Sequence, residues 1–89
     1  MKLKDKEMYE NWKAKNTDSY GAGIFRYAEK WANLMEVEIE NGASVKDVAE
    51  RLSHVADTEG ITGYMYGASV SILLQCWEHG EDLKEWNKK

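Results

Sequence analysis

The residues from Thr58 to Trp77 read TEGITGYMYGASVSILLQCW, and they give the clearest indication of the architecture of the chain. Three glycines and two tyrosines crowd the first half of this stretch, whereas the second half is mainly apolar. A glycine inside a helix costs about 1 kcal/mol relative to alanine. Three of them around the start of an apolar helix therefore indicate a place where a second backbone or a ligand comes close.

Apolar residues at helical spacing also occur in the other segments of the chain. This spacing predicts a first helix over Asp5–Lys15, a second over about Tyr20–Asn41 and a third that begins at Ser44. Thr62 can cap a fourth helix, whose wide apolar arc means that several neighbours cover it. A short amphipathic tail follows, and no segment alternates as a strand would. The expected fold is all-α, a compact bundle of four to five helices in a single domain over residues 1–89.

Composition argues against several classes of protein. The net charge of −4 is unlike that of a nucleic-acid binder, which would carry a basic face. No run of about 18 apolar residues is present, so no membrane span is expected. The charged start Met1–Glu7 is unlike a secretory signal. The single cysteine, Cys76, excludes an internal disulfide and suits a reducing cytoplasm.

Four tryptophans are an unusual number for 89 residues. Tryptophan is rarely fully buried and is enriched at interfaces. One interpretation is that a small domain fills its scarce core with large side chains; the other is that these rings serve subunit contacts or bind a ligand. We expect a homo-oligomer, most simply a two-fold dimer, because so short a chain cannot cover all its apolar surface. Its interface is expected at Trp12, Leu83 and Trp86, in the terminal helices.

Acidic residues offer a candidate metal site, because Glu36, Glu38 and Glu40 share one expected helix. Together with Glu78–Asp82 they could hold magnesium, which prefers oxygen ligands. Small all-helical pyrophosphohydrolases of the MazG type use an E-x-x-E pair followed by an E-x-x-D pair. Here the outer two glutamates are four residues apart, no E-x-x-D follows, and Glu38 can pair with Arg51 instead. We therefore expect no catalytic residue, no metal and no cofactor.

Two glycine–tyrosine helix starts form the better candidate site. One lies at Tyr20–Gly23 and the other at Gly60–Gly67. Helix N-termini present free N–H groups and a positive dipole end that suit phosphate, and aromatic rings can stack on a base. The alternative is that the glycines only let two helices cross closely. The candidate ligand-binding residues are Tyr20, Gly21, Gly23, Arg26, Trp31, Thr62, Gly63, Tyr64, Tyr66 and Gly67.

Four segments of the chain resemble a known group of proteins. They are Tyr20–Phe25, Tyr27–Ala32, Ala56–Gly67 and Cys76–Gly80. They are similar to small proteins carried by prophages and conjugative elements of gut Firmicutes, and the resemblance covers nearly the whole chain. It implies an accessory protein of a mobile element that works in the cytoplasm of a bacterial host. Proteins of that kind often disarm host defence.

The leading hypothesis from the sequence is an anti-defence protein that binds and sequesters a nucleotide-type signal without catalysis. The aromatic excess and the glycine-rich helix starts favour it, in a chain too small to enclose a ligand alone. The first alternative is a protein inhibitor of a host defence nuclease, like anti-CRISPR proteins, with its acidic face in a nucleic-acid groove. A MazG-like, magnesium-dependent nucleotide pyrophosphohydrolase is the second alternative.

Overall fold

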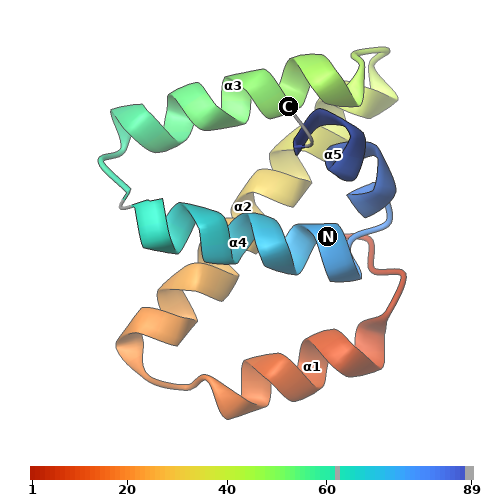
Figure 1. Cartoon of the computed structure of the whole chain (residues 1–89). Coiled ribbons are helices and arrows are strands. Elements are labelled where there is room, and N and C mark those ends of the chain that lie inside the picture. Colours follow the sequence, from red (N-terminus) through yellow and green to blue (C-terminus); the bar gives the residue numbers. More distant parts are fainter. Residues whose placement is uncertain (62, 88–89) are drawn as a thin grey trace.

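The computed structural model in Figure 1 describes residues 1–61 and 63–87, without the side chains of residue 56 and residues 85–87. In these residues the fold is all-α, as the sequence predicts, and five helices pack into one bundle. None of the helices described is long and apolar enough to cross a membrane. The helices are α1 (Lys6–Lys15), α2 (Ser19–Glu40), α3 (Val45–Thr58), α4 (Gly63–Cys76) and α5 (Gly80–Asn87).

Local signals set the helix ends close to where the sequence predicts them. The Ser44 hydroxyl accepts a hydrogen bond from the Asp47 N–H at 3.1 Å, which caps α3. Gly42 and Gly60 follow α2 and α3 with φ angles of +101° and +69°, in the left-handed region that favours glycine. These two turns are therefore encoded by single residues.

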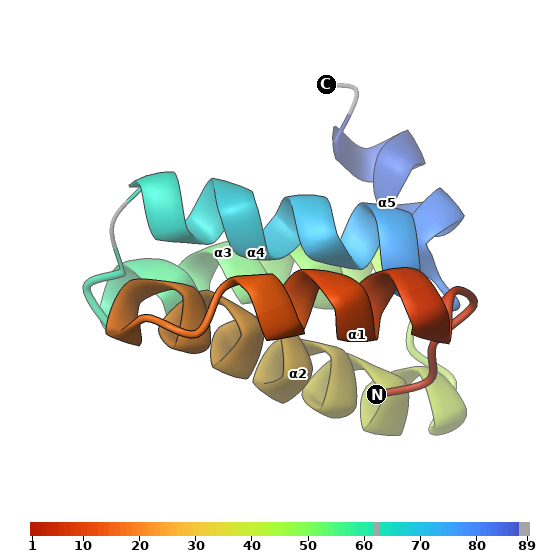
Figure 2. The ribbon, with the colours of Figure 1, turned by 90° about the horizontal axis from the view of Figure 1, so that it is seen from below.

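Helix α4 lies at the centre of the bundle. In Figure 1 it crosses in front of α2, with α1 below it and α3 above it, and Figure 2 shows α5 on the side of α4 away from α1 and α2. Its contacts with α1, α2 and α5 cover the wide apolar arc that the sequence predicts for it. The buried core includes Tyr9, Ile24, Phe25, Ala28, Trp31, Met35, Val48, Leu52, Leu73, Cys76, Trp77 and Leu83.

The N-terminal strap, residues 2–4, pairs with the segment that follows α4. Backbone hydrogen bonds join it to residues 76–78, with N···O distances of 2.9 Å. The indole of Trp77 is fully buried, and its Nε1 donates to the Glu36 carboxylate at 2.7 Å. The Lys2 N–H donates to the same carboxylate oxygen at 2.6 Å. The strap therefore ties the second half of α2 to the end of α4.

Helix α5 buries Leu83 against the rest of the chain, which corrects one expectation about assembly. Leu83 is 1% exposed, on a helix that packs against α3 and α4, so it cannot contribute to a subunit contact. Trp12 is half-buried against the core, and the side chain of Trp86 lies outside the described residues. Gly80 permits this packing, because a Cβ atom there would lie 2.6 Å from the carbonyl oxygen of Leu74.

Candidate functional site

Helices α2 and α4 cross closely at a contact made by small residues. At Gly23 an added Cβ atom would lie 3.1 Å from the Cε of Met65. The Ser69 side chain is fully buried, and its hydroxyl oxygen lies 3.2 Å from the carbonyl oxygen of Ile24 and 2.8 Å from that of Met65. The Ser69 contact favours a close helix crossing, one of the two interpretations of the glycines, whereas at Gly23 an added Cβ atom would meet only the flexible end of the Met65 side chain.

Gly21 serves the turn between α1 and α2. A Cβ atom there would lie 2.6 Å from the Asn16 carbonyl oxygen, so a larger residue would force the backbone to move. The Gly21 N–H donates to the Asp18 carboxylate at 2.6 Å, which caps the helix. A negative charge therefore already occupies the start of α2, and a phosphate group would have to displace it.

Trp31 lies inside the bundle, and Tyr66 packs half-buried against it. Trp31 is 1% exposed, stacks on Tyr27 with 5.4 Å between ring centroids, and meets Tyr66 at 5.8 Å. The Tyr66 and Ser53 hydroxyl groups share a hydrogen bond of 2.9 Å. These side chains come from α2, α3 and α4, so both aromatic rings connect the three helices. The Trp31 ring is covered, whereas the half-buried Tyr66 ring lines a small hollow of about 160 Å³ with Ser53 and Gly63.

Tyr20 and Tyr64 are the two candidate residues that the fold brings together on the surface. They stand at the starts of α2 and α4 and are 46% and 70% exposed, with ring centroids 5.5 Å apart and planes tilted by 40°. Beside them a hollow of about 240 Å³ opens between α1, α2 and α4. We call the two rings and this hollow the tyrosine patch. The hollow is lined by Trp12, Asn16, Gly21, Ile24, Phe25, Tyr64, Ala68, Ser71 and Ile72.

Three other candidate residues, Gly63, Gly67 and Arg26, do not line the hollow of the tyrosine patch. Gly63 and Gly67 are exposed, and an added Cβ atom would meet no described atom within 4 Å, so packing does not require glycine there. The guanidinium group of Arg26 lies over the ring of Tyr27, 5.3 Å from its centroid. Thr62 lies outside the described residues.

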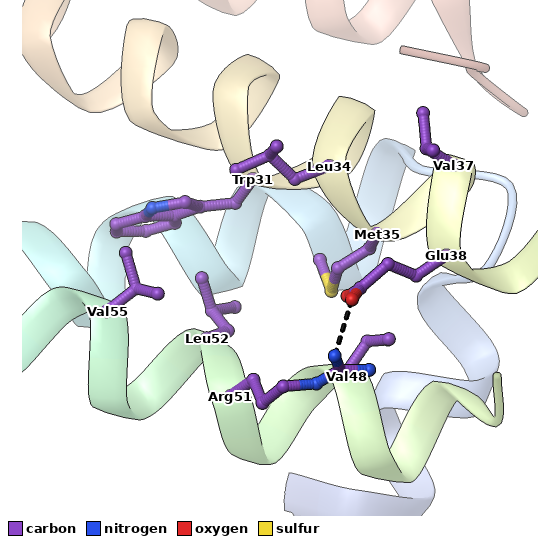
Figure 3. Close-up of a pocket in the computed structure, with 9 residues that line it drawn as sticks. All are labelled: Trp31, Leu34, Met35, Val37, Glu38, Val48, Arg51, Leu52 and Val55. Carbon is purple, nitrogen blue, oxygen red and sulfur yellow. Dashed lines mark ion pairs between the residues drawn. The ribbon is translucent and has the colours of Figure 1, made fainter.

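A second cavity, which the sequence analysis missed, lies between α2 and α3 (Figure 3). It has a volume of about 350 Å³ and mainly apolar walls. Glu38 of α2 and Arg51 of α3 form an ion pair of 2.5 Å across it, a pairing that the sequence suggested. Leu34 and Val37 flank it and are 53% and 58% exposed. We call this cavity the α2–α3 groove. Its lining residues are Trp31, Leu34, Met35, Val37, Glu38, Val48, Arg51, Leu52 and Val55.

The exposed large hydrophobic side chains gather in these two places. Among the described residues there are four of them, and two are the rings of Tyr20 and Tyr64 in the tyrosine patch. The other two are Leu34 and Val37 beside the α2–α3 groove. One place is aromatic and lies at the start of α2, and the other is aliphatic and lies along its second half. The chain therefore offers two surfaces of different chemistry.

The acidic residues are engaged by donors of the chain itself. Glu36 accepts hydrogen bonds from the Lys2 N–H and the Trp77 indole, and Glu40 pairs with the Lys2 ammonium at 3.0 Å. In the ranges that the structure describes, no three acidic, histidine or cysteine residues form a group that could hold a metal ion. The magnesium site considered from the sequence has no counterpart among these residues.

The chain is similar to one known protein family. A family model described as "Type I Thoeris inhibitor Tad4" matches it over residues 1–89. No curated protein and no solved structure matches it. The matched range includes all five helices, the tyrosine patch and the α2–α3 groove.

Proposed function

The chain belongs to the Tad4 family of Type I Thoeris inhibitors, and we propose that it binds the nucleotide signal of this host defence and holds it without chemical change. Inhibitors of the Tad type sequester that signal. The expectation of an anti-defence protein from a phage or another mobile element agrees with this family. The proposal places the protein in the cytoplasm of the host cell, where a signal made by the host can be intercepted.

The observation that carries the proposed site is the tyrosine patch. Tyr20 and Tyr64 are far apart in the chain, yet their rings meet at 5.5 Å and remain exposed. Apolar surface left in water is unfavourable, so gathered exposed rings mark a place that a partner can cover. Aromatic rings bind the face of a nucleobase, and such stacking contributes about 1–3 kcal/mol per base.

The geometry of the tyrosine patch defines how a base would bind. Aromatic pairs in contact have centroids about 4.5–7 Å apart, so Tyr20 and Tyr64 already touch and no base fits between them. A base would instead lie on the exposed face of Tyr64 and reach the hollow beside Trp12 and Phe25. The hollow, about 240 Å³, is smaller than the roughly 300–1,000 Å³ of sites that enclose a whole ligand. It therefore suits one part of a nucleotide.

Charge contributes little to this contact. Asp18 occupies the start of α2. Arg26 follows Tyr20 by six residues, which places it about 120° around the helix at roughly 100° per residue. We therefore expect stacking to supply most of the affinity, and we expect the affinity to change little with salt. An acidic face that bound in a nucleic-acid groove would instead weaken as salt rises.

A calorimetric titration with cyclic dinucleotides and ADP-ribose derivatives tests the proposal. The unaltered chain is expected to bind at least one of these compounds. Tyr64→Ala is expected to lower the affinity by about 5- to 150-fold, which corresponds to about 1–3 kcal/mol of stacking. Tyr66→Phe is the matched control, because it keeps a half-buried ring outside the tyrosine patch and loses only the hydroxyl group that contacts Ser53.

A loss of affinity in Tyr64→Ala with no loss in Tyr66→Phe supports the tyrosine patch as the site. If no compound of the panel binds to the folded chain, sequestration of a nucleotide signal is wrong. Chromatography of the released ligand tests whether the chain acts as an enzyme. We expect the ligand to return unchanged even with magnesium present, whereas a hydrolysed product would favour the pyrophosphohydrolase alternative.

A further inference from the structure

We propose that the α2–α3 groove is the surface through which two copies of this chain bind each other about a two-fold axis. The inference goes beyond the proposed function and does not depend on it. It rests on a ridge and a hollow that lie side by side on one surface. In a two-fold dimer both copies present the same surface, so a surface that carries both parts is complementary to itself.

The ridge consists of Leu34 and Val37, which are one turn apart on α2 and more than half exposed. The hollow is the neighbouring groove of about 350 Å³, with Met35, Val48 and Leu52 in its walls (Figure 3). Apolar side chains of one helix commonly pack into the hollows that a facing helix presents. Two copies placed face to face can therefore each insert their ridge into the groove of the other.

The charged residues at the groove are also self-complementary, because each copy carries one negative and one positive side chain there. Glu38 and Arg51 lie on opposite walls and form an ion pair, yet both side chains remain partly exposed. When two copies face each other, Glu38 of one copy approaches Arg51 of the other. The four side chains then form a polar rim around an apolar centre, which is the usual anatomy of a protein interface.

The lining of the groove argues against a ligand that carries phosphate groups. Arg51 is the one cation among the lining residues, and Glu38 already neutralises it. A phosphate group placed there would meet apolar walls without a counter-charge, which is unfavourable. A second copy brings an aliphatic ridge and a matching pair of charges, so its chemistry fits this surface better.

The dimensions of the chain allow such a contact. A stable interface covers about 800 Å² on each partner, which is about one seventh of the 5391 Å² of accessible surface of the chain. The contact must therefore extend beyond the groove along α3 and along α2, whose 22 residues span about 33 Å. Tyr20 at the start of α2 and Tyr64 at the start of α4 lie away from the groove, so a contact centred on the second half of α2 is expected to leave both rings exposed. Assembly and ligand binding can therefore be measured separately.

Light scattering at micromolar concentration tests the proposal. The unaltered chain is expected at about 20.6 kDa, twice its mass of 10.3 kDa. Leu34→Glu is expected to halve the measured mass, because it places a charge on the apolar ridge. Val37→Lys repeats the test at the more exposed ridge position, and circular dichroism identifies any variant that has lost its helices. Tyr64→Ala is the matched control and is expected to remain a dimer.

A mixing experiment shows whether the charges act between copies. Glu38→Arg and Arg51→Glu each place like charges around the groove, so each variant alone is expected to be mainly monomeric. Mixed in equal amounts they are expected to form a heterodimer, because each supplies the charge that the other lacks across the axis. An effect confined to one chain could not be repaired by mixing.

Three results would overturn the proposal: a mass of about 10.3 kDa for the unaltered chain, a dimer that survives both ridge variants, or a mixture that stays monomeric. A monomer that still binds a nucleotide would overturn the dimer and leave the proposed function intact. A dimer that binds none of the nucleotides would overturn the proposed function and leave the dimer intact.

Discussion

The first half of helix α2 packs closely against α4, whereas its second half leaves a groove of about 350 Å³ against α3. In the first half, Gly23 lies against the end of the Met65 side chain, and the buried Ser69 hydroxyl contacts the backbone of α2. In the second half, the indole N–H of Trp31 is buried without a hydrogen-bond partner among the described residues. The contact across the groove there is a partly exposed ion pair. One helix therefore carries both a closely packed contact and an open one.

This difference separates residues that hold the fold from residues available to partners. The sequence predicts a candidate site at glycines next to aromatic residues, but Gly21 is required by the Asn16 backbone within the chain. The accessible apolar surface consists of the rings of Tyr20 and Tyr64 and of the aliphatic ridge beside the groove. The exposed side chains are therefore a better guide to function than the glycines.

The largest expected effect comes from overfilling the close contact. Ser69→Leu adds a bulky side chain where α2 and α4 already touch, and overpacking of this kind costs about 1–3 kcal/mol of unfolding free energy. The melting temperature should fall by about 4–8 °C for each kcal/mol lost in a domain of this size. Thermal unfolding followed by circular dichroism measures the change.

Val55→Leu is the matched control for that prediction. It enlarges an apolar side chain in the wall of the α2–α3 groove, where space is available. The unfolding free energy should stay within about 0.5 kcal/mol of the unaltered value. An equal loss of stability in both variants would contradict the contrast between the two contacts of α2.

An intermediate effect is expected at Glu36, the glutamate that points toward the end of α4. Partial burial would raise the pKa of Glu36, but hydrogen bonds from the Lys2 N–H and the Trp77 indole outweigh it and hold the pKa below its usual value. The charged carboxylate therefore stabilises the fold above an unfolded pKa of about 4.3, and this stabilisation is lost as the pH falls through the folded pKa.

Glu36→Gln should therefore lower the unfolding free energy by about 1–2 kcal/mol at pH 7, because a charged hydrogen-bond acceptor is removed. Denaturant unfolding at several pH values should show that the gap between the unaltered chain and the variant narrows as the solution becomes more acidic than about pH 4. A gap that stays constant down to pH 2 would show that the carboxylate charge is not what stabilises this contact.

The smallest effect is expected two residues further on, at Glu38, which points toward α3. Its ion pair with Arg51 is partly exposed, so Glu38→Gln should change the unfolding free energy by less than about 1 kcal/mol. The change should disappear at high salt, which screens exposed charges. The comparison is made in the Leu34→Glu background, so that assembly does not contribute. A loss as large as that in Glu36→Gln would show that the groove is held together more firmly than its geometry indicates.

Most of the fold could be predicted because its signals are local. Helical periodicity predicted where the helices lie, and Ser44 marked the start of α3. Periodicity also places residues on a face, which is why Glu38 and Arg51 could be paired from the sequence. These features depend on neighbours within a few positions in the chain or on matching helix faces.

The candidate site could be predicted only in part, because it depends on distances between helices. Leu34 belongs to the same apolar stripe as Trp31, yet Leu34 is 53% exposed and Trp31 is 1% exposed. The stripe predicts which face of α2 points toward its neighbours. The separation of α2 and α3 then decides how much of that face is buried. In the same way, the contact of Tyr20 with Tyr64 results from the crossing of two helices, which periodicity does not specify.

The N-terminal strap sets an order of events during synthesis of the chain. Residues 2–4 are translated early, but their backbone partners at residues 76–78 are translated near the end. Contacts between such distant segments require closure of a long loop and form late in folding. Until Trp77 has been made, Glu36 lacks one of its two N–H donors and the second half of α2 is not tied to α4. A nascent chain that stops before residue 76 can form its first helices, but it cannot close the bundle.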